Sequence, residues 1–171
     1  MIKEDNLKSS TLQFLKNLKD NNDRTWFEKN RSRYEEARAD FMTLFEQLVN
    51  EVAQFDNGVA EDRESAKKVF RIYRDVRFSK DKSPYKKHFG GAIVPGGMNS
   101  GHAGYYVPIQ PGGQSGTAGG MYDLDSKILL KVRKAISERF EEFIRIIEDN
   151  EFVKEFGAVN KENVLKRVPS G

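Results

Sequence analysis

The residues best suited to chemistry are concentrated in one basic segment, residues 67–88, whose sequence is KKVFRIYRDVRFSKDKSPYKKH. It contains nine lysines and arginines and two aspartates, so its formal charge is +7, whereas the whole 171-residue chain carries only +3. A local excess of this size indicates either a site for an anion or a network of ion pairs. The basic segment is therefore the first place to look for function.

An alternating pattern of apolar and polar residues predicts an extended strand over residues 70–78. Arg71, Asp75 and Arg77 would then project together from one face of the strand. Two guanidinium groups on one face can hold a phosphate or a carboxylate, and Asp75 would orient an arginine or act as a general base. The apolar side chains would share the opposite, core-facing side: Phe70, Ile72, Val76 and Phe78.

An equally weighted alternative is that these charges neutralise one another on a solvated sheet face, because structural ion-pair networks are common. In that case Asp75 simply pairs with the neighbouring arginines. Arg74 needs an explanation under either hypothesis, since it is the one polar residue on the predicted core face. A buried unpaired charge is costly, so we expect either a carboxylate partner for Arg74 or a bulge that turns it outward.

The sequence SKDKSP at residues 79–84 predicts a turn, because it has no hydrophobic residue and its proline disfavours helix before it. Lysines on and after this turn could surround an anion. His88 joins Asp75 as a candidate for acid–base chemistry. The predicted ligand-binding residues are Arg71, Arg77, Lys80, Lys82, Lys86 and Tyr85.

Several classes of site are excluded or unsupported. The chain has no cysteine, which excludes disulfides, thiolate nucleophiles and cysteine-ligated zinc. Its two histidines, His88 and His102, do not form a metal-binding helical pair, so no metal site is predicted. The glycine-rich residues 111–120 contain neither a Walker A nor a dinucleotide fingerprint, so no cofactor is predicted.

Periodicity predicts helices at the two ends of the chain and strands between them. Apolar residues at helical spacing predict a first helix from Ser10, a second from about residue 25 to 54 with a bend near 30–32, and a third from Asp125. Further strands are predicted at 89–94, 104–110 and 121–122, and a short helix at 151–156. This order predicts an α+β fold, with a largely antiparallel sheet flanked by N-terminal and C-terminal helices.

Length and composition fit a single soluble domain over residues 1–171, with 37% hydrophobic and 32% charged residues. Residues 161–167 resemble the approach to another element, so we expect the natural chain to continue past Gly171. No apolar run is long enough to cross a bilayer and no signal peptide is evident, so a cytoplasmic protein without a membrane partner is expected.

The signature RDVRFSKDKSPYK at residues 74–86 resembles the domain of unknown function 2461 family. The similarity extends to NNDRTWF at residues 21–27, to GGMY at 119–122 and to KVR at 131–133, and so covers essentially the whole chain. The resemblance implies a soluble α+β domain whose members usually continue past this chain's end. It brings no established activity and no catalytic residues.

Three hypotheses about function remain open, and the sequence does not decide whether the protein is an enzyme. The first is a site for a phosphate-bearing or other anionic ligand on the basic segment. The second is a nucleic-acid-binding module in which Tyr73 and Tyr85 stack on bases beside the basic residues. The third is a structural or interaction domain whose charges pair internally.

Overall fold

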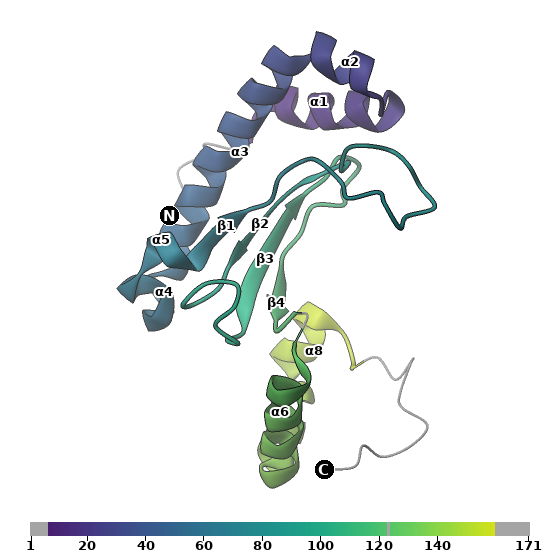
Figure 1. Cartoon of the computed structure of the whole chain (residues 1–171). Coiled ribbons are helices and arrows are strands. Elements are labelled where there is room, and N and C mark those ends of the chain that lie inside the picture. Colours follow the sequence, from purple (N-terminus) through teal and green to yellow (C-terminus); the bar gives the residue numbers. More distant parts are fainter. Residues whose placement is uncertain (1–6, 123, 160–171) are drawn as a thin grey trace. The chain divides into compact units, whose positions relative to one another are not determined.

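The computed structural model describes residues 7–122 and 124–159, which belong to two compact units divided after Tyr122. The prediction of an α+β fold is confirmed (Figure 1). Along the chain, helices both precede and follow the four strands of an antiparallel sheet. The sheet has the order β1-β2-β3-β4. The first unit contains α1 (Ser9–Asp20), α2 (Arg24–Lys29), α3 (Arg31–Val52), α4 (Asn57–Glu61), α5 (Arg63–Ala66), β1 (Lys67–Val69), β2 (Phe89–Ile93), β3 (Gly104–Ile109) and β4 (Ala118–Gly120).

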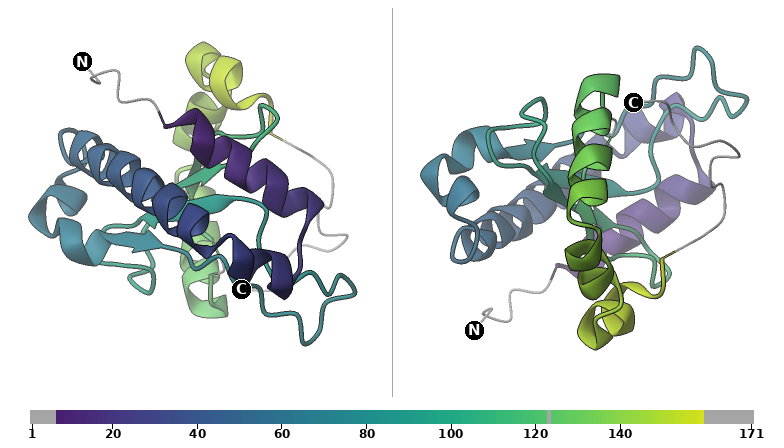
Figure 2. Two further views of the ribbon diagram at one scale, coloured as in Figure 1. Left: turned by 90° about the horizontal axis from the view of Figure 1, so that it is seen from above. Right: turned by 90° about the horizontal axis from the view of Figure 1, so that it is seen from below.

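The N-terminal helices lie on one side of the sheet in Figures 1 and 2. The core of the first unit consists of side chains from these helices and from the sheet. The predicted bend in the second helix is confirmed, because α2 ends before Asn30 and α3 begins after it. The Asp23 side chain caps α2 by accepting the Trp26 backbone N–H at 2.9 Å, whereas α1 has no side-chain cap. The helices contribute these buried side chains: Phe14, Leu15, Leu18, Phe27, Phe41, Phe45 and Val49.

Strand β2 is buried along its whole length and has a different neighbour on each face. Its Phe89 side chain stacks on Phe41 on the helix side, with ring centroids 5.5 Å apart. At Gly91 the Phe45 ring lies so close that an added Cβ would be 2.3 Å from it. On the other face, an added Cβ at Gly90 would lie 2.7 Å from the Tyr106 hydroxyl oxygen. The two glycines therefore let aromatic rings approach the backbone from both sides.

The strand predicted over residues 70–78 does not form. Strand β1 ends at Val69, although the Phe70 N–H still donates to the Gly90 carbonyl at 2.9 Å. Beyond it, Tyr73 and Tyr85 form an isolated bridge. Phe78, predicted to be in the core, is 95% exposed. The physical reason is that backbone and side-chain groups in residues 74–83 bond one another rather than a neighbouring strand. The last strand also lies earlier than predicted, at Ala118–Gly120 rather than at 121–122.

The second unit contains α6 (Ser126–Glu138), α7 (Phe140–Ile147) and α8 (Asn150–Phe156). The single helix predicted from Asp125 is interrupted at Arg139, which belongs to neither α6 nor α7. Asp125 and Asp149 cap α6 and α8 with their side chains. The short helix predicted at 151–156 is confirmed as α8, which is followed by Gly157 with a φ of 77°. The expectation about residues 161–167 lies outside the described residues. Among the described helices, none has the length and apolar character needed to cross a membrane.

Substituting Gly91 with alanine is expected to lower the free energy of unfolding by about 1–3 kcal/mol, because the new methyl group collides with the buried Phe45 ring. Urea unfolding followed by circular dichroism would measure the change. Gly116→Ala is the matched control, since nothing lies within 4 Å of its added Cβ. Equal urea midpoints for the two variants would contradict the close packing of Phe45 on β2.

Candidate functional site

The basic segment forms a closed loop rather than a strand. We call residues 74–84 the basic loop. Its two ends are joined by backbone hydrogen bonds, from Arg74 N–H to the Pro84 carbonyl at 2.9 Å and from Lys86 N–H to the Ile72 carbonyl at 2.7 Å. This pairing turns the chain back on itself, so residues before and after the loop enter it side by side.

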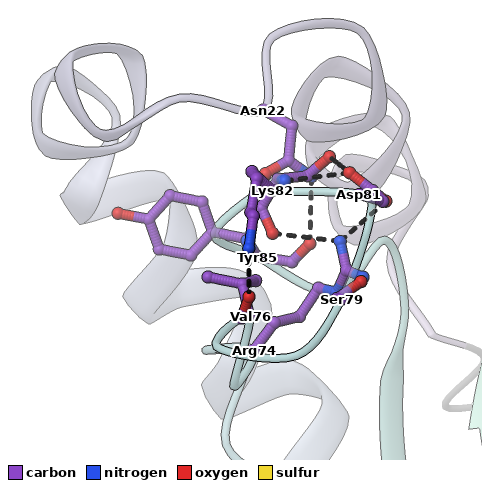
Figure 3. Close-up of polar contacts among 8 residues, drawn as sticks. Asn22, Arg74, Val76, Ser79, Asp81, Lys82 and Tyr85 are labelled. Carbon is purple, nitrogen blue, oxygen red and sulfur yellow. Dashed lines mark hydrogen bonds and ion pairs between the residues drawn. The ribbon is translucent and has the colours of Figure 1, made fainter.

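The base of the basic loop is hydrogen-bonded to Asn22, which lies between α1 and α2 (Figure 3). The Asn22 side-chain amide donates to the Tyr85 carbonyl at 3.0 Å and accepts the Tyr85 N–H at 3.1 Å. The Tyr85 ring is 3% exposed and stacks on Phe27, with ring centroids 4.0 Å apart. Tyr85, predicted to contact a ligand, is therefore placed in the core.

Arg74 organises the interior of the basic loop, as Figure 3 shows. Its guanidinium donates to Asp81 at 2.7 Å, to the Ser83 carbonyl at 3.0 Å and to the Ser79 hydroxyl at 3.3 Å. Asp81 also accepts the Ser83 N–H at 2.9 Å and the Ser83 hydroxyl. The bonds from Ser83, and then the charge of Arg74, hold the pKa of Asp81 well below its ordinary value. The carboxylate partner expected for Arg74 thus comes from the loop itself and not from a helix.

Other predicted site residues are also engaged within the loop. Arg77 makes a bidentate contact with Asp75, with N–O distances of 3.0 and 2.6 Å. The hydrogen bond from Arg77 is the main cause that lowers the pKa of Asp75, so this carboxylate is a weak base. Lys82 donates to the Val76 carbonyl at 3.0 Å and lies 3.4 Å from that of Arg77. Lys80 is exposed and lines neither the depression beside α3 nor the pocket on the sheet.

A pocket of about 540 Å³ lies on the sheet face that carries Tyr106, away from the N-terminal helices. We call it the sheet-face pocket. Its apolar lining includes Phe70, Ala92, Val94 and Met98, and residues 118–122 form another part of its wall. Its polar lining includes Lys86, His88 and Tyr106, and among the described residues no aspartate or glutamate lines it.

The electrostatics of the sheet-face pocket follow from burial and from positive charge. Burial, and then the charge of Arg71, lowers the pKa of Lys86. Burial, and then the charge of Lys86, lowers the pKa of His88, so its imidazole is neutral at pH 7. The Tyr106 hydroxyl lies 3.4 Å from His88 Nε2, and burial raises the pKa of Tyr106. Lys86 Nζ lies 5.3 Å from the centroid of the Phe70 ring, a cation–π arrangement.

The predicted site residues are therefore divided among several places. Lys86 and His88 line the sheet-face pocket, whereas Arg71 lines a separate depression beside α3. Sequence reasoning missed Tyr106 and Phe70 as pocket residues. The alternation of β3 could have placed Tyr106 on the other face of the sheet from Tyr105 and Val107. It could not have shown that the Tyr106 hydroxyl lies beside His88. Within residues 7–122 and 124–159, no group of three His, Cys, Asp or Glu side chains could hold a metal ion.

Comparison with known proteins identifies a family but no characterised relative. The family model described as "Conserved hypothetical protein (DUF2461)" matches residues 10–171. Because the match covers nearly the whole chain, it establishes family membership and agrees with the resemblance drawn from the RDVRFSKDKSPYK signature. Neither the curated proteins nor the solved structures contain a match.

Substituting Arg74 with alanine is expected to lower the free energy of unfolding by about 1–3 kcal/mol, because it leaves partly buried acceptors of the loop without a donor. Arg77→Ala is the matched control. It removes the same charge from an ion pair whose arginine side chain is 77% exposed, against 24% for Arg74. Exposed pairs contribute little, so Arg77→Ala should change stability less. Equal urea midpoints for the two variants would contradict the central role of Arg74.

Proposed function

The chain belongs to the DUF2461 family of conserved hypothetical proteins, and we propose that it binds a small organic anion in the sheet-face pocket. The ligand has an apolar or aromatic body and a phosphate or carboxylate group that contacts Lys86. The observation that carries this proposal is the convergence of Lys86, His88 and Tyr106 on one mostly apolar pocket, which no acidic residue lines in the part of the chain that the structure describes.

The apolar part of the proposal rests on the size and lining of the pocket. Small-molecule sites in proteins commonly have volumes of roughly 300–1,000 Å³ and a mostly apolar wall with a few polar groups. At about 540 Å³, with Phe70, Val94 and Met98 in its lining, the sheet-face pocket fits this description. The flat face of the Phe70 ring and the glycine-rich strand β4 suit a planar ligand body.

The anionic part of the proposal rests on Lys86. Its ammonium group is partly buried, which disfavours the charged form, and it has no ion-pair partner among the described residues. Arg71 adds positive potential nearby. A bound anion would offset both effects, because an opposite charge within about 4–6 Å favours the ammonium form. Lys86 was among the ligand-binding residues predicted from the sequence.

His88 and Tyr106 supply hydrogen bonds for the same ligand. A neutral imidazole offers one donor and one acceptor, and the Tyr106 hydroxyl can donate or accept. A neutral His88 beside a cationic lysine can also accept a proton, which keeps the acid–base role predicted for His88 as part of this proposal. Asp75, the other acid–base candidate, is held in the basic loop by Arg77.

The two rival hypotheses relate to other parts of the basic segment. Nucleic-acid binding by paired tyrosine platforms is weakened by the burial of Tyr85, although Tyr73 remains 43% exposed. Internal ion pairing describes the basic loop well, because Arg74 and Arg77 both have carboxylate partners. It does not account for Lys86, which lies outside the loop and faces the pocket.

The variant Lys86→Met is expected to weaken the binding of benzenesulfonate by about 10- to 100-fold, because a charge-assisted hydrogen bond is removed. Benzenesulfonate serves as the probe because it combines an aromatic body with one permanent negative charge. Isothermal titration calorimetry would measure the affinity. Lys80→Met is the matched control, since it removes the same charge from a residue outside the pocket. Equal losses in the two variants, or no binding to the unmodified protein, would overturn the proposal.

The affinity for benzenesulfonate is expected to rise as the pH falls from about 8 to about 5.5, the range in which histidine titrates. In the free protein the pKa of His88 is lowered by burial and by Lys86. A bound anion raises that pKa, so binding takes up a proton between the free and bound pKa values. The variant His88→Gln should remove this pH dependence while retaining binding at pH 8. An unchanged pH profile in His88→Gln would contradict the placement of the anion beside His88.

A further inference from the structure

One face of the first half of α3 carries arginine and tyrosine side chains at helical spacing. Arg31, Tyr34, Arg38 and Met42 follow one another by three or four residues, so they lie along a single stripe of the helix. Together with residues 69–73 they line a depression of about 490 Å³, which we call the α3 trough. No family motif or predicted site included Arg31 or Arg38.

The opposite wall of the α3 trough is the chain that leads from β1 to the basic loop. Val69, Arg71 and Tyr73 line the trough, whereas Phe70 lines the sheet-face pocket. This alternation is expected of an extended backbone, whose successive side chains point to opposite sides. The same few residues therefore contribute to two different sites, and Arg71 belongs to the α3 trough.

The α3 trough contains more positive charge than its carboxylates neutralise. Arg31 is paired with Glu28 at 3.4 Å and with Glu35 at 3.3 Å, so that part of the trough is compensated. Within the described residues, Arg38 and Arg71 make neither an ion pair nor a side-chain hydrogen bond. This distinguishes them from Arg74 and Arg77, which are both bonded to aspartates.

The effect of these unpaired charges extends to neighbouring groups. Burial raises the pKa of Tyr34, and the positive charge of Arg38 opposes that rise. The charge of Arg71 contributes to lowering the pKa of Asp75 and of Lys86. Ala39, Met42 and Val69 also line the trough, so part of its wall is apolar.

We propose that the α3 trough binds the dianionic phosphate group of a small phosphate monoester, held between the guanidinium groups of Arg38 and Arg71. Two guanidiniums can bind a phosphate through several charge-assisted hydrogen bonds. The hydroxyl groups of Tyr34 and Tyr73 supply additional donors at the same site. Arg31 pairs with Glu35, which reduces the repulsion between this carboxylate and the phosphate.

The α3 trough and the sheet-face pocket select different ligands. The trough is lined by arginines and tyrosines and takes a compact doubly charged group, whereas the pocket is mostly apolar and contains one lysine. The phosphate proposal therefore stands independently of the function proposed above. Glycerol phosphate is a suitable probe, because it carries a phosphate monoester without an apolar body for the sheet-face pocket.

Titration calorimetry with glycerol phosphate near pH 8, where the ester is a dianion, would test the proposal. Arg38→Ala is the decisive variant, since it lies on α3 and outside the sheet-face pocket. It should weaken binding by at least about tenfold, and Tyr34→Phe by a smaller factor. Arg33→Ala is the matched control, because Arg33 lies on the same helix but does not line the trough. It should leave the affinity within about twofold of the original.

Two outcomes would overturn the proposal. The first is the absence of glycerol phosphate binding to the full chain at millimolar concentration. The second is an equal loss in Arg38→Ala and Arg33→Ala, which would mean that only the general positive charge of the helix attracts phosphate. Lys86→Met should bind glycerol phosphate like the original protein, so failure of the sheet-face pocket proposal would leave this result unchanged.

Discussion

The arrangement of both candidate sites depends on the pairing of residues 72–74 with residues 84–86. Two backbone hydrogen bonds close the basic loop at this point, and the Asn22 amide and the Phe27 ring hold Tyr85 against the N-terminal helices. Because buried backbone groups must be bonded, this small polar junction fixes where the chain enters and leaves the loop. It directs Arg71 and Tyr73 toward α3, and Lys86 and His88 toward the sheet face that carries Tyr106.

Charge neutralisation divides the basic segment into structural and available cations. Lys67 lies 2.6 Å from Glu46 and 2.7 Å from Glu64, and the two aspartates of the segment are bonded to Arg74 and Arg77. The charges of Lys67, Arg74 and Arg77 are therefore neutralised by carboxylates of the protein itself. Arg71 and Lys86 have no such partner among the described residues, although both lie in concave surroundings. Lys86 is partly buried, so its lack of a counterion is unfavourable, and an anionic ligand is the simplest group that relieves it. Arg71 is exposed and adds positive charge nearby.

Strand β2 joins the stability of the first unit to the shape of the sheet-face pocket. Its backbone at Gly90 and Gly91 lies between Tyr106 on the pocket side and Phe45 on the core side. Side chains at these positions would collide with the two rings, so both positions require glycine. Because protein interiors are closely packed, a displacement of Phe45 in the core would also disturb the wall of the pocket that β2 forms.

The sequence by itself determined the elements whose signals are local. Helical spacing predicted α1 and α3, a bend was predicted near residues 30–32, and strands were predicted at 89–94 and 104–110, where β2 and β3 lie. It also predicted that residues 67–88 are the chemically distinctive part of the chain. Only the tertiary structure decided which cation meets which partner. Alternation predicted a strand over residues 70–78, but side-chain bonds within the loop replaced the ladder. The junction itself joins Asn22 to Tyr85, 63 residues away, and Arg38 and Arg71 line one depression from a helix and from an extended segment. Such contacts depend on how elements pack, and local periodicity carries no information about packing partners.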